Sequence, residues 1–128
     1  MTTFDEAPLD REAPPIEVRG LISRIGDRTI HDNLDLVVNR GDVVGVVGAS
    51  GTGKSVLLNT LIGLRSAEDG SVKIFGQDIR HARRRQWTAI NRRWGVLFQQ
   101  GALWSNLTVK ENVAAPLFEH TDMLKDEI

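Results

Sequence analysis

Hydrophobic and polar residues alternate in two early parts of the chain, residues 16–19 and residues 34–38. Alternation with a period of two predicts strands that bury one face. Turn-forming residues at 26–28 lie between the two segments, so the pattern predicts a hairpin. Residues 43–47 differ, because four valines and one glycine make them apolar on both faces. A run of this kind predicts a central strand that is covered from both sides.

The rest of the chain predicts an alternation of helices and strands. Apolar residues within 56–64 recur with helical spacing, so a helix with a wide apolar face is expected there. Thr108 and Glu111 form a capping-box pattern at the start of another helix, which should end before Pro116. The remaining predicted elements are turns at 39–41, 68–70 and 76–77, strands at 71–75 and 95–98, and a helix within 80–92.

Length and composition indicate one globular domain. The chain has 128 residues, of which 41% are hydrophobic and 26% charged. No apolar run reaches the roughly 18 residues of a membrane-spanning helix, so none is expected. The chain has no cysteine, which is compatible with a reducing compartment. Residues 1–14 are acidic and proline-containing, which predicts a disordered N-terminal lead that does not resemble a secretion signal.

Charge is distributed unevenly although the net charge is only −1. Six arginines lie within residues 80–93, while both ends of the chain are acidic. An arginine-rich block could contact nucleic acid or anionic lipid headgroups. A solvated helix face explains the same block more simply.

The strongest chemical signal is the octet GASGTGKS at residues 48–55, which matches G-x-x-x-x-G-K-[ST] in full. Its glycines let successive backbone N–H groups converge on an anion, and a helix that starts there adds its own free N–H groups. Lys54 can bridge the β- and γ-phosphates, and the Ser55 hydroxyl can hold Mg²⁺. A plain connecting turn would need neither side chain. The residues expected to bind a nucleoside triphosphate are Gly48, Ala49, Ser50, Gly51, Thr52, Gly53, Lys54, Ser55 and Val56.

The motifs around this octet resemble those of ABC transporter ATPase subunits. The octet has that family's variant G-x-S-G-x-G-K-S, and residues 68–79 are similar to its stretch "xDGxVxxxGxDI". Residues 95–99, Gly-Val-Leu-Phe-Gln, look like the family's Q-loop. The resemblance implies that Gln99 approaches Mg²⁺ and the attacking water, so Lys54 and Gln99 are the expected catalytic residues. It also implies that the same loop faces a membrane subunit.

A longer segment narrows the resemblance. Residues 98–121, FQQGALWSNLTVKENVAAPLFEHT, are similar to ATPase subunits of phospholipid-trafficking ABC systems that maintain outer-membrane lipid asymmetry. One departure is the region Leu21–Ile25, where the family has an aromatic residue that stacks on adenine. Loss of one such stack costs about 1–3 kcal/mol unless Arg24 or Ile25 covers the ring. A smaller departure is Val56, where the family often has a second hydroxyl.

Other family motifs do not occur in residues 100–128. The LSGGQ-type signature, the Walker B strand and the switch histidine are missing there. His120 lies too early for the switch, and Asp126 and Glu127 follow no apolar strand. We therefore expect no ATP turnover by this chain alone, because phosphoryl transfer needs a positioned water and charge neutralisation. We also expect an open apolar edge beside residues 43–47.

The sequence thus predicts an α/β fold, with a P-loop NTPase-type sheet and a flanking antiparallel β-subdomain. Residues 15–128 would form the first part of an ABC nucleotide-binding domain, from Walker A to Q-loop. The resemblance implies ATP and Mg²⁺ as cofactors, and a permease subunit and a second ATPase subunit as partners. It implies no nucleic acid, and it places the protein on the cytoplasmic face of the inner membrane. The alternatives are a small-molecule kinase, and an RNA- or lipid-binding module in which Trp87 and Trp94 stack beside the arginines.

Overall fold

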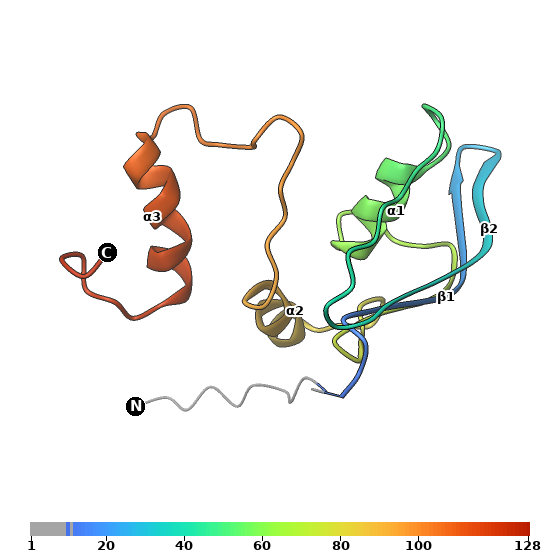
Figure 1. Cartoon of the computed structure of the whole chain (residues 1–128), viewed down its shortest axis with the longest axis horizontal. Helices are drawn as coiled ribbons and strands as arrows, with labels where there is room; N and C mark the ends of the chain where they lie inside the picture. The colour runs from blue at the N-terminus through green and yellow to red at the C-terminus, as the bar shows by residue number, and fades with distance from the viewer. Residues whose placement is uncertain (1–9, 11) are drawn as a thin grey trace. The chain divides into compact units, whose positions relative to one another are not determined.

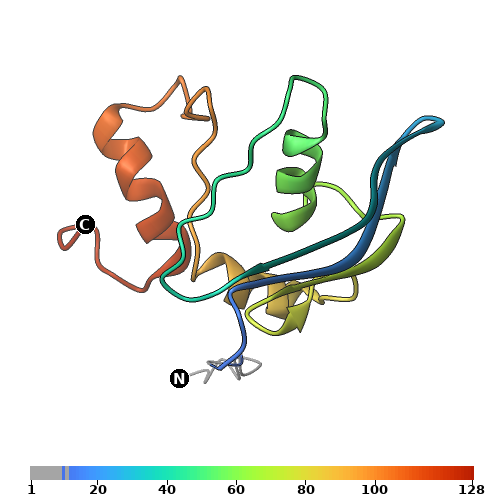
Figure 2. The ribbon, with the colours of Figure 1, turned by 45° about the vertical axis from the view of Figure 1, so that its right-hand side comes forward.

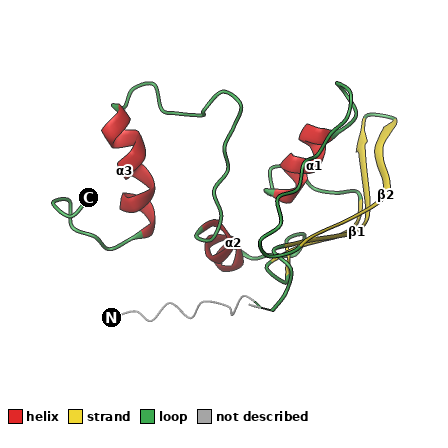
Figure 3. Cartoon of the chain, in the orientation of Figure 1, coloured by secondary structure: helices red, strands yellow, loops and turns green. Residues whose placement is uncertain are grey.

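The computed structural model describes residue 10 and residues 12–128. Most of the expected disordered lead, residues 1–9 and 11, lies outside the described residues. The chain divides into two compact units, Met1–Ile90 and Asn91–Ile128, and each is described by itself. The elements are β1 (Ile16–Ile25), β2 (Arg28–Val38), α1 (Lys54–Leu61), β3 (Asp69–Ile74), β4 (Gln77–Asp78), α2 (Arg84–Asn91) and α3 (Val109–His120). Figures 1 and 3 label the helices and the strands β1 and β2.

A four-stranded sheet with the order β2-β1-β3-β4 organises the first unit. Every neighbouring pair of strands is antiparallel. Ile25 pairs with Arg28 around the turn Gly26-Asp27, so the predicted hairpin is confirmed, with strands longer than the alternation indicated.

The predicted turns around β3 need two corrections. Asp69 and Gly70 already belong to the strand, where Gly70 adopts a φ of +89°. Asp69 pairs with Ile22 of β1, a long-range contact that overrides the local turn signal. The turn to β4 consists of Phe75 and Gly76, whose φ angles of 48° and 78° are both positive, and Gln77 already pairs with Ile74. Positive φ at both central residues is typical of a tight two-residue hairpin.

A bulge bends β1 in its middle. Val18 pairs with Leu36 and Leu21 pairs with Leu34, so two residues of β1 oppose one of β2. The extra residue Gly20 has a φ of +58°, and its N–H donates to Oδ1 of Asp35 at 2.7 Å. The carboxylate therefore satisfies a backbone donor that the ladder leaves unpaired.

One face of the sheet builds the core of the first unit. Both α1 and the sheet contribute buried apolar side chains, and Figure 2 shows α1 lying over the strands. Burying each large aliphatic side chain contributes about 1.5–3 kcal/mol. The buried apolar residues of this unit are Val18, Leu21, Leu57, Leu61, Val72, Ile74, Ala89 and Ile90.

Two polar residues are buried on the same face. Ser23 of β1 is 0% exposed and His31 of β2 is 8% exposed, and the two lie opposite one another in the β1–β2 register. The hydroxyl of Ser23 hydrogen-bonds to Nδ1 of His31. Desolvation by burial lowers the pKa of His31, and hydrogen bonding with the backbone of Gly53 partly opposes the shift. The imidazole is therefore held in its neutral form more firmly than an exposed histidine.

The predicted central strand at 43–47 is wrong for this structure, because the segment is irregular and open to solvent. Val43 is 100% exposed and Val47 is 92% exposed. The predicted strand at 95–98 is wrong for the same reason, and Leu97 is 89% exposed. A strand requires a neighbour that accepts and donates its ladder hydrogen bonds. Within the described residues neither segment has such a neighbour.

In the second unit, the capping box at α3 is confirmed. The backbone N–H of Thr108 donates to Oε2 of Glu111 at 2.7 Å, and the N–H of Glu111 donates to Oγ1 of Thr108 at 3.2 Å. The Thr108 N–H and the Thr108 hydroxyl, which donates to the same Oε2 at 2.8 Å, lower the pKa of Glu111 by stabilising its carboxylate. The helix continues through Pro116 to His120, so the predicted end before Pro116 is wrong. Proline removes one hydrogen-bond donor from a helix but does not oblige it to stop.

The arginine-rich helix is confirmed with narrower bounds. Helix α2 covers Arg84–Asn91, while Arg80 lies in a turn before it and Arg83 directly precedes its first residue. Trp87 of α2 packs against Gly63, because a Cβ at Gly63 would lie 2.2 Å from the Trp87 ring. The absence of a side chain at Gly63 therefore lets α2 approach the end of α1 closely.

Gly70→Ala should destabilise the first unit. A Cβ at this position would lie 2.4 Å from the carbonyl oxygen of Gly20, a backbone atom that cannot move without distorting the β1–β3 pairing. We expect a loss of about 2–4 kcal/mol, from backbone strain together with overpacking. Gly41→Ala is the matched control, since Gly41 has a similar φ of +83° with nothing within 4 Å. Denaturant unfolding measures both variants, and equal losses would contradict the proposed clash.

The buried His31 should make folding stability depend on pH. Its pKa is lowered in the folded state, so the unfolded chain, with an ordinary pKa of about 6.5, takes up the proton first as pH falls. The free energy of unfolding should therefore decrease from about pH 7 downward and level off below the folded-state pKa. His31→Phe should remove this component, and His120→Phe, at an exposed position, should keep it. Denaturant titrations across this range check the slope, and an unchanged slope in His31→Phe would refute the assignment.

Candidate functional site

The glycine loop connects the irregular segment at 43–47 to α1. Within it, the N–H and the Oγ1 of Thr52 both donate to the carbonyl oxygen of Ala49, at 3.3 and 2.7 Å. Gly51 and Gly53 have φ angles of 78° and 103°, in the left-handed region that favours glycine. A Cβ at Gly48 would lie 2.6 Å from the Thr52 hydroxyl, so the first glycine leaves room for the curl. The loop thus closes on itself through its own polar groups.

The N-terminus of α1 is left uncapped by side chains. Gly53 is the N-cap residue and offers no side-chain oxygen, and the first turn contains no acidic residue. The first intrahelical bond runs from the N–H of Leu57 to the carbonyl oxygen of Gly53, at 2.8 Å. The N–H groups before Leu57 therefore have no partner within the helix, and the positive end of the helix dipole adds to their charge. Such an end is a ready site for an anion.

Lys54 supplies a full positive charge at the same place. Its Nζ donates to the carbonyl oxygens of Gly48 and Ala49, at 2.6 and 2.7 Å, so the side chain spans the loop. An ammonium group has three donors, which leaves one more for a ligand. Ser55 is the second residue of α1 and is exposed, so its hydroxyl is accessible beside the loop. The structure therefore brings together the predicted residues 48–56.

The fit of this loop to a magnesium–triphosphate ligand can be judged from its donors. Unpaired N–H groups and an ammonium group match phosphate oxygens, and a serine hydroxyl is an oxygen ligand suited to Mg²⁺. Mg²⁺ commonly takes only one or two protein ligands in addition to phosphate oxygens and waters. In the part of the chain that the structure describes, no cluster of three or more His, Cys, Asp or Glu side chains could hold a metal. The donors of the glycine loop therefore fit a magnesium–triphosphate ligand.

Close packing fixes the position of Gly53. A Cβ there would lie 2.4 Å from Cγ2 of Ile30 and 2.8 Å from Nε2 of His31, both on β2. The third glycine of the motif is thus required by its contact with the sheet as well as by its φ. Sequence reasoning missed His31 as a neighbour of the loop. The available signal was a histidine inside a strand, but no residue pattern marked the bulges that place this histidine beside the loop.

Gln99, the other predicted catalytic residue and magnesium ligand, lies in the second unit. It is exposed and belongs to a turn in which the N–H of Gly101 donates to the carbonyl oxygen of Phe98, at 2.9 Å. Asn112 fixes the segment that follows, because its side chain bonds both the N–H and the carbonyl oxygen of Trp104, at 2.9 and 3.1 Å. The role of Gln99 stays a prediction.

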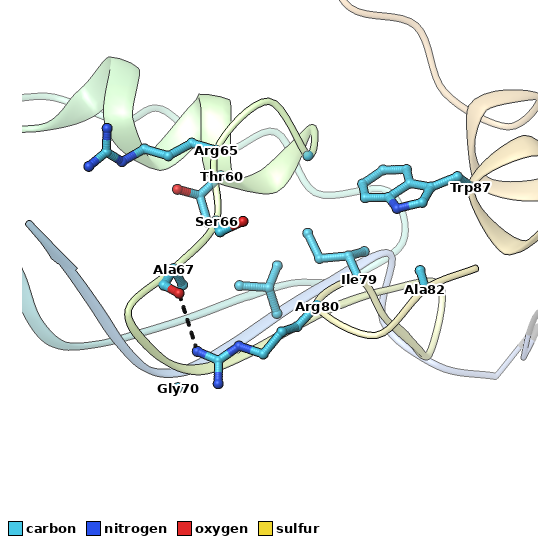
Figure 4. Close-up of a pocket in the computed structure, with 11 residues that line it drawn as sticks. Thr60, Arg65, Ser66, Ala67, Gly70, Ile79, Arg80, Ala82 and Trp87 are labelled. Carbon is cyan, nitrogen blue, oxygen red and sulfur yellow. Dashed lines mark hydrogen bonds between the residues drawn. The ribbon is translucent and has the colours of Figure 1, made fainter. Parts of the chain in front are cut away.

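A separate cavity of about 240 Å³ lies in the first unit, away from the glycine loop. Figure 4 shows Arg65, Arg80 and Trp87 around it, and Arg80 donates to the carbonyl oxygen of Ala67 at 3.5 Å. Arg65 donates to the carbonyl oxygen of Arg24, while its Nε is buried without a hydrogen-bond partner. The cavity contains none of the predicted nucleotide-binding residues.

Comparison with known proteins identifies the family of the chain. The family profile described as "ABC transporter" matches residues 31–127. The intermembrane phospholipid transport system ATP-binding protein MlaF of Haemophilus influenzae is 41% identical over 108 residues, which are 84% of this chain and 41% of that protein. The probable ribonucleotide transport ATP-binding protein mkl of Mycobacterium tuberculosis is 42% identical over 113 residues, which are 88% of this chain and 32% of that protein.

Solved structures give the same result. An ATP-binding cassette in a dimeric post-hydrolysis state with ADP and Pi superposes with a TM-score of 0.75 at 28% identity, covering 88% of this chain and 51% of that chain. The neighbours confirm the predicted α/β cassette class, although the described strands form only its antiparallel part. The chain thus spans about half or less of the length of the relatives it matches. None of its described helices is long and apolar enough to cross a bilayer. The family profile, the similar proteins and the sequence of the glycine loop all agree. The chain therefore belongs to the ATP-binding proteins of ABC transporters.

Proposed function

We propose that residues 48–56 bind the phosphate groups of Mg·ATP in the ATP-binding subunit of a transporter. The observation that carries the proposal is the uncapped start of α1, with Gly53 as N-cap and the Lys54 ammonium lying across the loop. Free N–H groups, helix dipole and ammonium all favour the same ligand charge. Family membership favours ATP over a smaller anion as that ligand.

Each residue type has a distinct task in this proposal. The backbone N–H groups of Gly51, Gly53, Lys54 and Ser55 donate to phosphate oxygens. Lys54 exchanges a carbonyl contact for a contact with the phosphates. Ser55 holds Mg²⁺, which when bound neutralises phosphate charge. Gln99 is assigned the orientation of the attacking water by its family resemblance. The absence of an aromatic residue at 21–25 leaves Ile25, which is 51% exposed, or Arg24 to cover adenine.

For the transported substrate we propose phospholipid or a related amphiphile. Support comes from residues 98–121, which resemble phospholipid-trafficking ATPases, and from MlaF relatives in Haemophilus influenzae and Escherichia coli at 41% and 35% identity. The mkl relatives, whose printed name is probable ribonucleotide transport, suggest a second candidate. Transport assays with the two ligand classes would distinguish them.

For partners we propose a membrane permease subunit and a second copy of the ATPase subunit, on the cytoplasmic face of the inner membrane. Support comes from the family, and from the dimeric cassettes that superpose on this chain. Residues 15–128 would be the first part of the nucleotide-binding domain. Their activity depends on the motifs that this sequence does not contain.

Lys54→Ala should weaken Mg·ATP binding about ten- to hundredfold, because charge-assisted hydrogen bonds contribute about 1.5–3 kcal/mol each. Calorimetric titration with Mg·ATP measures the change. Lys110→Ala is the matched control, since Lys110 is an exposed lysine of the second unit. Equal affinities for the wild type and Lys54→Ala would refute the proposed site.

The 128-residue chain by itself should release no phosphate from ATP above the level of its Lys54→Ala variant. Turnover requires a carboxylate near the attacking water and a partner loop over the nucleotide, and the sequence has neither of the corresponding motifs. Phosphate release measured on both chains provides the test. A rate that disappears in Lys54→Ala would show that these residues suffice for hydrolysis.

A further inference from the structure

We propose that Ser23 and His31 form a positioning pair for the phosphate-binding loop. In this proposal, the pair holds the backbone of Gly53 so that the free N–H groups of α1 point toward the phosphates. The inference rests on the proposed function and adds two residues of the β1–β2 hairpin to it. Neither residue belongs to the glycine motif.

The geometry places His31 between a fixed partner and the loop. Its Nδ1 is bonded to the hydroxyl of Ser23, which is 0% exposed and lies directly across the β1–β2 ladder. Its Nε2 faces Gly53, because a Cβ on that glycine would lie only 2.8 Å from it. The two ring nitrogens thus connect the rigid sheet on one side to the loop on the other. The ring is only 8% exposed, so little solvent competes for these contacts.

Gly53 is the point at which such a contact has the most effect. It is the last residue before α1, and its carbonyl oxygen accepts the first helical hydrogen bond, from Leu57, at 2.8 Å. A shift of Gly53 would therefore tilt the whole first turn, which contains Lys54 and Ser55. Glycine is also the residue with the widest backbone freedom, so a φ of +103° must be held by its surroundings. Those surroundings are the side chains of Ile30 and His31.

Core packing alone does not explain why Ser23 and His31 are buried here. A serine and a histidine buried face to face must give up hydration, and an apolar pair would fill the same space without that cost. Buried polar groups that are fully bonded fix one geometry, whereas apolar groups tolerate several. The pair therefore favours a defined position of Gly53 more than it favours stability. Its effect should appear in phosphate affinity.

Three substitutions separate a role in positioning Gly53 from a role in stability. His31→Phe keeps a planar ring of similar size and removes both polar contacts. His31→Gln retains a polar group at the reach of Nε2, and Ser23→Ala removes the anchor of the ring. His120→Phe, at an exposed position of α3, is the matched control. Mg·ATP and inorganic tripolyphosphate are each titrated calorimetrically into the full-length protein and its variants. Thermal unfolding of the same proteins is recorded separately, without ligand.

We expect His31→Phe to bind both ligands about tenfold more weakly, because of its two lost contacts the one with Gly53 is the contact that positions the loop. Its thermal midpoint without ligand should not fall in proportion, since an apolar ring fills the site. His31→Gln should restore affinity to within about threefold, and Ser23→Ala should lie between the two. An equal loss for tripolyphosphate and Mg·ATP would show that the effect acts on the phosphate end of the ligand.

Wild-type affinity in His31→Phe and Ser23→Ala would overturn the positioning role and leave the proposed function intact. If His31→Phe does not fold, His31→Gln and Ser23→Ala decide the question in the same way. A wild-type protein that binds neither ligand would overturn the proposed function, and the positioning role with it. The Lys54→Ala variant, measured alongside, distinguishes failure of the positioning role from failure of the proposed function. Only the proposed function requires Lys54→Ala to lose affinity for the two ligands.

Discussion

The contact between Gly53 and β2 is the constraint on which the candidate site depends. Ile30 and His31 approach so closely that no side chain fits at position 53. This contact seats the start of α1 on the sheet and sets the direction of its free N–H groups. The bulges in the β1–β2 ladder, at Gly20 and at Asn33 with its φ of 57°, determine which residues of the hairpin face the loop. The geometry of an anion site is therefore fixed by strands that contribute no residue to the glycine motif.

Features that depend on neighbouring residues could be predicted from the sequence. The hairpin at Gly26, the loop at 48–55 and the capping box at Thr108 each arise from contacts within a few positions, and all three occur in the structure. The signal in each case is chemical, namely a residue that tolerates positive φ or a hydroxyl that accepts from a free N–H. The identity of the family followed from such local signals, because its motifs are short and closely spaced.

Features that depend on distant partners could not be predicted in this way. The apolar run at 43–47 has the composition of a buried strand, yet its valines are exposed. Side-chain periodicity reports which residues prefer burial and carries no information on which backbone will complete the ladder. The strand assignment of Asp69 was missed for the opposite reason, because its partner Ile22 on β1 lies far away in the sequence. The burial of His31 was missed for similar reasons, since its neighbours come from β1 and from the glycine loop, both distant in the sequence.

The proposed function assigns the two chemical tasks of a nucleotide-binding cassette to different parts of this chain. The proposed donors to phosphate lie within residues 48–56, and the side chains that support them come from β1 and β2 in the same compact unit. Gln99, which would act on the attacking water, lies in the other unit. Phosphate recognition can therefore be complete locally, because backbone N–H groups and one lysine suffice for an anion. Hydrolysis additionally requires a second segment to be placed against the loop, and that placement depends on interactions between segments that the glycine loop does not provide.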